Sequence, residues 1–193
     1  KEKNDNVLIL FNTEALYFQN FYHAKNPPSQ YFIIKNFLNL FEPSIIKSFF
    51  FRPHPNDVWN VKDKIIQDFG LEKVDNKKDF NSTICNYKLI INTVPQTTFF
   101  ETMASDIPNI LLLQQDLLNL NENVQQLLLD MKMNNMLFDN IELAKNHMLN
   151  IWENPSEWWE NQKTRQIRDQ FQRVCSMKTK NDLLFWVDFL KKL

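Results

Sequence analysis

The chain has 193 residues and a formal net charge of −1, and 44% of its residues are hydrophobic. This length suits one domain, and 17 phenylalanines and 5 tryptophans provide material for a sizeable core. Because basic residues are not in excess, nucleic acid is not an expected partner. No apolar run approaches the ~18 residues that a membrane-spanning helix needs.

The numbers and positions of glycine and cysteine exclude several kinds of binding site. The single glycine, Gly70, rules out the G-x-G-x-x-G fingerprint and the P-loop, which need several glycines to bring the backbone close to phosphate. A bound nucleotide must therefore be held by side chains and by a helix end. Cys85 and Cys175 lack metal or redox spacing, so we expect two buried free thiols, as in a reducing compartment.

Short apolar runs bounded by polar residues predict buried strands. In chain order they cover residues 7–11, 48–52, 71–75, 88–91, 110–113 and 136–138. Segments with helical spacing of apolar residues alternate with them at 29–41, 57–69, 78–86, 99–105, 122–132 and 141–152, and further helices follow residue 154. This alternation predicts a Rossmann-like three-layer α/β/α fold with a parallel sheet of about five to six strands.

The stretch 89–113 reads as strand, polar loop, helix and strand, which is one βαβ unit. Thr97 and Thr98 stand where the helix should begin. There the free N–H groups, the helix dipole and two hydroxyls suit a phosphate. The alternative is a capping box, in which Thr98 and Glu101 only satisfy the first amides of the helix. The local pattern leaves both readings open.

The sequence RPHPND, residues 52–57, follows the second predicted strand. Arg52 offers a planar fork of donors for phosphate or carboxylate, and His54 can donate to a phosphate. Asn56 or Asp57 is expected to cap the next helix. The alternative is a rigid turn with Arg52 in a surface ion pair. Asn12 follows the first strand. The two main loops should lie at the same sheet edge, at the ends of neighbouring strands.

Other residues give weaker signals. His23 and His147 have no visible metal-binding partners, and we expect no metal or cofactor. The pair Trp158–Trp159 either stacks on a sugar or base or, more often for tryptophan, packs in a core.

Three blocks occur in the same order as in a family of longer bacterial transferases. They are RPHPND followed by Trp59, NTVPQTTFFETMASDIPNILL from Asn92, and EWWENQKTRQIRDQF from Glu157. The chain resembles these glycosyltransferases of surface-carbohydrate loci from about residue 7 to residue 171. They are related more distantly to the Kdo and sialic-acid transferases of lipopolysaccharide and capsule synthesis.

The resemblance implies the C-terminal, donor-binding half of a GT-B glycosyltransferase. Residues 1–153 would be the Rossmann-like nucleotide-sugar domain, and residues 154–193 would be helices that cross to a separate N-terminal half. That half, or a partner chain, would bind the acceptor. We expect a cytoplasmic protein, with peripheral association at the inner face of the bacterial inner membrane left open.

The resemblance also implies roles for individual residues. His54 would contact the donor phosphate or cytidine, Thr97 and Thr98 would hold phosphate, and Arg52 would add charge. Glu101 would reach the ribose or complete the cap. The candidate ligand-binding residues are Asn12, Arg52, His54, Asp57, Gln96, Thr97, Thr98 and Glu101.

One departure from the family pattern is Val94-Pro95-Gln96, which stands where small or polar residues are usual. Pro95 stiffens the loop and removes an N–H donor. Since such enzymes take their catalytic base from the N-terminal half, we expect the isolated chain to bind a donor nucleotide weakly and to transfer nothing. The alternative is a non-catalytic, degenerate transferase-like interaction module.

Overall fold

The structure is a computed structural model that describes residues 4–11, 27–57, 59–77, 79–113 and 122–175, and residues 187, 190 and 191. Its described part contains a sheet of five parallel strands. The strands are β1 (Asn4–Leu10), β2 (Phe49–Arg52), β3 (Tyr87–Asn92), β4 (Asn109–Leu112) and β5 (Leu137–Phe138).

Helices precede or follow each strand along the chain, as the alternating pattern predicted. They are α1 (Pro27–Leu38), α2 (Pro43–Ile46), α3 (Val61–Phe69), the 3₁₀ helix η1 (Leu71–Lys73), α4 (Phe80–Ile84), α5 (Thr97–Ala104), α6 (Glu122–Met133), α7 (Ile141–Asn150), α8 (Pro155–Glu160) and α9 (Gln162–Cys175).

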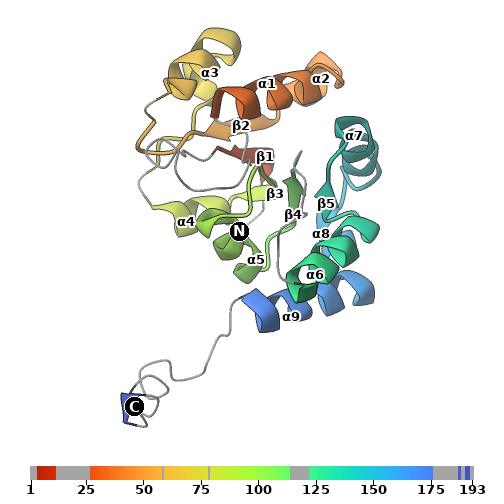
Figure 1. Cartoon of the computed structure of the whole chain (residues 1–193). Helices are drawn as coiled ribbons and strands as arrows, with labels where there is room; N and C mark the ends of the chain where they lie inside the picture. Colours follow the sequence, from red (N-terminus) through yellow and green to blue (C-terminus); the bar gives the residue numbers. More distant parts are fainter. Residues whose placement is uncertain are drawn as a thin grey trace.

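The helices cover both faces of the sheet (Figure 1). On one face, α1, α3 and α7 pack on alternate residues such as Val7, Ile9 and Leu89. On the other face, α4, α5, α6 and α9 cover residues such as Leu8 and Leu111. Every residue of β3 is buried, which fits a strand covered on both sides. The predicted Rossmann-like three-layer fold is confirmed.

Strand order decides how the predicted loops lie. The spatial order is β2-β1-β3-β4-β5, so β1 pairs with both β2 and β3. All pairs are parallel, and the loops after β2 and β3 therefore leave the same edge of the sheet, as expected. The expectation that these two strands are neighbours is wrong, because β1 lies between them. The order reverses at β1 and β3, which is where open α/β sheets usually bind ligands.

Two local predictions differ from the structure. Residues 71–75 do not form a strand: Leu71–Lys73 is a 3₁₀ turn, and only Val74 pairs with β2, at Phe51. The turn follows Gly70, which ends α3 with a φ of 99°. Free thiols were expected to be buried, but Cys85 is exposed and Cys175 is half-buried.

The C-terminal helices share the core. Trp159 of α8 is buried together with Phe171 of α9 and Phe99 of α5, and α9 packs along α6. Trp159 is thus a packing residue, while the division into domains 1–153 and 154–193 stays a prediction. None of the described helices is long and apolar enough to cross a membrane.

Candidate functional site

A pocket of about 500 Å³ opens beside the loop that follows β2. Its walls come from this loop, from the start of α3 and from the segment before α4. The lining residues are Arg52, Pro53, His54, Pro55, Asp57, Asn60, Lys62, Asp63, Asp75, Asn76 and Lys77. Three of the sequence-predicted residues, Arg52, His54 and Asp57, therefore share one cavity.

The side chain of His54 is held by its own loop. Pro53 and Pro55 fix φ on either side of the histidine. The backbone N–H of Asn56 donates to Nδ1 of His54 over 3.0 Å. Since Nδ1 accepts a hydrogen bond, the proton of the neutral ring must be on Nε2. His54 can thus offer one N–H donor to a ligand.

Asp57 hydrogen-bonds to the start of α3, but the prediction that Asn56 or Asp57 is the capping residue is wrong, because the N-cap residue is Asn60. Its carboxylate accepts a hydrogen bond of 2.6 Å from the backbone N–H of Lys62, in the first turn of α3. The helix begins at Val61, later than predicted, after Asn60 in a left-handed conformation with a φ of 54°. Asp57 therefore stabilises the start of α3, where its negative charge also interacts favourably with the helix dipole.

Arg52 is fixed on three sides. Its Nη1 donates to the carboxylate of Asp75 over 3.1 Å, and its Nη2 donates to the carbonyl of Lys77 over 2.8 Å. The guanidinium also lies 5.3 Å from the ring centre of Phe80. The side chains of Arg52 and Asp75 are only 13% and 2% exposed, so the predicted surface ion pair is largely buried.

The fixed charges of the pocket nearly cancel. The residues that line it include three with cationic side chains, Arg52, Lys62 and Lys77, and three with carboxylates, Asp57, Asp63 and Asp75. Net attraction for an anion is therefore small. The pocket therefore offers directed hydrogen-bond donors and acceptors more than a net charge.

The second candidate group lies at the start of α5. Gln96 is the N-cap residue and makes no side-chain capping hydrogen bond, while its carbonyl accepts the N–H groups of Phe99 and Phe100. The capping box predicted for Thr98 and Glu101 is wrong, because Thr98 is already the second residue of the helix.

The hydroxyls at this helix start are accessible. Thr97 is exposed and Thr98 is half-buried, and Glu101 is exposed one turn later. Among the described residues, neither threonine hydroxyl has a hydrogen-bond partner. These hydroxyls and the first amides of α5 remain available to an anion.

The structure does not bring the two groups into one pocket. Gln96, Thr97, Thr98 and Glu101 do not line the cavity beside β2. With β1 between β2 and β3, the two loops start about 10 Å apart across the sheet. A ligand that touches both must span this distance. Asn12 lies outside the described residues.

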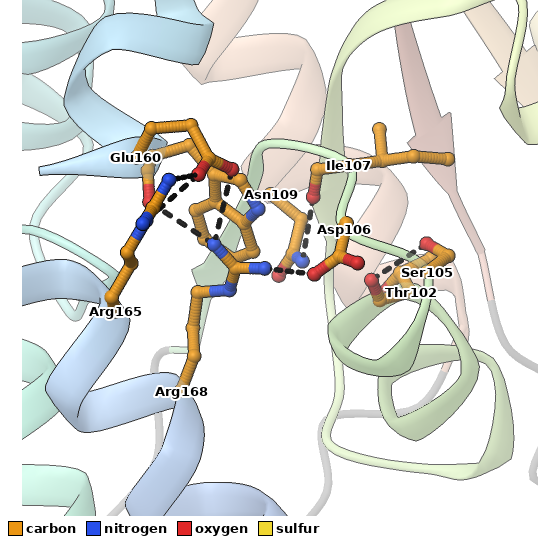
Figure 2. Close-up of polar contacts among 9 residues, drawn as sticks. Thr102, Ser105, Asp106, Ile107, Asn109, Glu160, Arg165 and Arg168 are labelled. Carbon is orange, nitrogen blue, oxygen red and sulfur yellow. Dashed lines mark hydrogen bonds and ion pairs between the residues drawn. The ribbon is translucent and has the colours of Figure 1, made fainter.

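A second arginine cluster lies at the opposite edge, where β4 begins (Figure 2). Figure 2 shows the guanidinium of Arg168, from α9, between Asp106 and Glu160. The same group donates to the carbonyl of Trp159 over 3.1 Å and lies 4.4 Å from its ring centre. This cluster ties the C-terminal helices to the loop between α5 and β4.

Sequence reasoning missed Asp75, Lys77 and Arg168. Asp75 is the last residue of the segment 71–75, for which the pattern predicts a strand, and Lys77 follows that segment. Arg168 meets Asp106 from 62 positions away in the chain. A single sequence carries no signal for contacts of this kind.

His147, which has no visible metal-binding partner in the sequence, is buried. Its Nε2 has no hydrogen-bond partner in the described part of the chain, and its ring lies 4.8 Å from that of Trp158. Burial lowers the pKa of His147 to about 4. No group of three or more acidic, histidine or cysteine side chains able to hold a metal occurs among the described residues.

The model of the LIC12162 family transferase matches residues 1–190. No curated protein and no solved structure matches the chain.

Proposed function

Because the chain belongs to the LIC12162 family of transferases, we propose that it binds the activated donor of a group transfer at the carboxyl edge of β2, β1 and β3. The observation that supports this most is the pocket of about 500 Å³ at the end of β2, at the edge where open α/β sheets bind ligands.

We propose further that the donor is a sugar nucleotide and that the chain is the donor half of a GT-B glycosyltransferase. Its product would be a bacterial surface glycan, and a CMP-linked Kdo or sialic-acid-like sugar fits the resemblance of the three sequence blocks. The acceptor site and the catalytic base would come from another part of a longer protein or from a partner chain.

The chemistry would be stabilisation of the leaving nucleotide. The hydroxyls of Thr97 and Thr98 and the amides of α5 would hold phosphate, and Nε2–H of His54 would donate from the neighbouring pocket. Donors that are already in place cost little reorganisation when charge develops on the leaving group. The distance of about 10 Å between the two loops fits a ligand that places phosphate at the start of α5 and another part of the donor in the pocket beside β2.

Thermal shift and calorimetry with CMP, UDP, GDP and their sugars would test the proposal. One nucleotide should stabilise the chain, and both Thr98→Ala and His54→Ala should weaken its binding by roughly 1–3 kcal/mol, the cost of a lost charge-assisted hydrogen bond. Ser82→Ala, which removes an exposed hydroxyl from α4, is the control and should bind as the wild type does. Equal affinity in all four proteins would exclude these residues.

A second candidate is a non-catalytic module that pairs with another chain. The observation that favours it is the internal use of pocket residues: Arg52 is paired with Asp75, and Asp57 hydrogen-bonds to the start of α3. This candidate predicts no response to any of the nucleotides, together with self-association in sedimentation experiments.

A further inference from the structure

We propose that Asp75 is a positioning residue of the pocket beside β2, and that it holds the guanidinium of Arg52 in the orientation that the ligand requires. The inference rests on the proposed function, since it concerns how the same pocket recognises its ligand.

The position of Asp75 is set by the strand that carries Arg52. The backbone N–H of Asp75 donates to the carbonyl of Phe51 over 2.8 Å, and Val74 pairs with Phe51. The carboxylate accepts from Nη1 of Arg52 and from the backbone N–H of Lys77, each over 3.1 Å. These contacts lock the segment from Val74 to Lys77 against the end of β2.

The segment from Val74 to Lys77 holds the guanidinium of Arg52 but uses only some of its N–H donors. A guanidinium has five N–H groups, and the contacts with Asp75 and the carbonyl of Lys77 use two of them. Phe80 supports the planar group at 5.3 Å. Since Arg52 lines the pocket, its remaining N–H donors form a planar group in a fixed orientation. Binding of a ligand therefore does not lose conformational entropy by ordering this long side chain.

Asp75 also determines whether Arg52 attracts a ligand by its net charge or by the direction of its hydrogen bonds. Its carboxylate, with 2% of the side chain exposed, compensates the charge of Arg52. Attraction by net charge is therefore weak, and affinity comes from the direction of the donors. The ligand class is one that presents two acceptors to a planar fork, such as a phosphate or carboxylate.

The decisive experiment is a double-mutant cycle on ligand binding. Arg52→Gln, Asp75→Asn and the double variant are compared with the wild type by calorimetry, with the tightest binder among CMP, UDP and GDP. Each single variant should bind about tenfold more weakly, and the double variant should also lose about tenfold rather than a hundredfold, because both changes remove the same oriented fork.

The matched control is Asp68→Asn. Asp68 also accepts from a cation, Lys35 at 2.6 Å, but it lies between α1 and α3 and does not line the pocket. Its replacement should leave the dissociation constant unchanged. Circular dichroism would establish that each variant is folded at the temperature of the titration.

A further variant, Arg52→Lys, covers the case in which Asp75→Asn does not fold. Lysine keeps the charge and lacks the planar fork, so binding should weaken about tenfold if orientation matters. Wild-type affinity in Arg52→Lys would overturn the proposal.

The remaining outcomes separate this proposal from the proposed function. Unchanged binding in Asp75→Asn beside weak binding in Arg52→Gln would make Asp75 merely structural, and so would fully additive losses, while the proposed function would stand. A wild-type chain that binds none of the nucleotides would overturn both.

Discussion

Arg52 and Arg168 have nearly the same surroundings at opposite edges of the sheet. Each guanidinium donates to one aspartate and to one backbone carbonyl, and each lies over an aromatic ring, Phe80 or Trp159. Arg168 also donates to Glu160. The aspartates differ. Asp75 has 2% of its side chain exposed, whereas the partner of Arg168, Asp106, has 75% exposed.

From this difference we expect a binding role for the cluster of Arg52 and a structural role for the cluster of Arg168. Beside β2 the carboxylate of Asp75 is the more buried partner. Arg52 lines the pocket, and its contacts with Asp75 and Lys77 use only two of its N–H donors. At the start of β4 the arginine is the buried member, with 7% of its side chain exposed, and it joins the C-terminal helices to the core. The first should govern ligand affinity, and the second should govern stability.

The largest expected effect is at Trp159, under the guanidinium of Arg168. Trp159→Ala should cost about 3–5 kcal/mol of unfolding free energy, since it empties a fully buried site. Urea denaturation measures the loss, and Phe32→Ala, which removes an exposed ring, should change little. A small cost for Trp159→Ala would mean that the C-terminal helices are not part of the core.

Arg52→Met should cost about 3 kcal/mol, because it leaves the buried carboxylate of Asp75 without its cation. The double variant Arg52→Met/Asp75→Asn should regain part of this loss in urea denaturation. If the double variant is less stable than Arg52→Met alone, the carboxylate is not the source of the cost.

His147 tests whether the aromatic region next to Trp158 excludes water. Its pKa is lowered by burial from the ordinary 6.5 to about 4, so the unfolded chain binds the extra proton more readily than the folded chain does. Stability should be full above pH 6.5 and should fall between pH 6.5 and pH 4, by up to roughly 3 kcal/mol. His147→Phe should flatten this part of the pH profile measured by urea denaturation. A profile that is the same in both proteins would contradict the assignment.

Arg168→Met should cost less than Arg52→Met, about 1–2 kcal/mol. Its removal breaks buried hydrogen bonds, but the aspartate left behind is largely solvated. Arg165→Met, which also loses a contact with Glu160 but at an exposed position, should cost under about 0.5 kcal/mol. Equal costs for Arg52→Met and Arg168→Met would remove the distinction between the two clusters.

The sequence predicted the layers better than the site. The strand Tyr87–Asn92 is buried on both faces, so its short apolar run between polar residues predicts a strand. The capping box failed because its pattern is local, whereas the helix begins two residues earlier, after Gln96. A contact of Asp57 with the start of the next helix was predictable, since its partner, Lys62, is only five residues away, although the N-cap residue is Asn60.

The contacts that shape the pocket could not be predicted in the same way. The pair Arg52 and Asp75 forms because Val74 docks on β2, and this docking depends on the turn at Gly70 and on tertiary packing. The separation of the two loops depends on strand order, which a hydrophobic pattern does not specify. The sequence therefore predicted that the loops after β2 and β3 leave the same edge of the sheet. The residues of the α5 loop, however, do not line the pocket beside β2.

Strand order has a consequence for how the chain acquires its structure. Asn4–Leu10 comes first in the chain but lies inside the sheet, with its two partners at Phe49–Arg52 and Tyr87–Asn92. During synthesis the first strand must wait until residue 92 has left the ribosome before both of its edges are paired. Changes within residues 4–10 should thus impair folding yield more than changes in the short outer strand Leu137–Phe138.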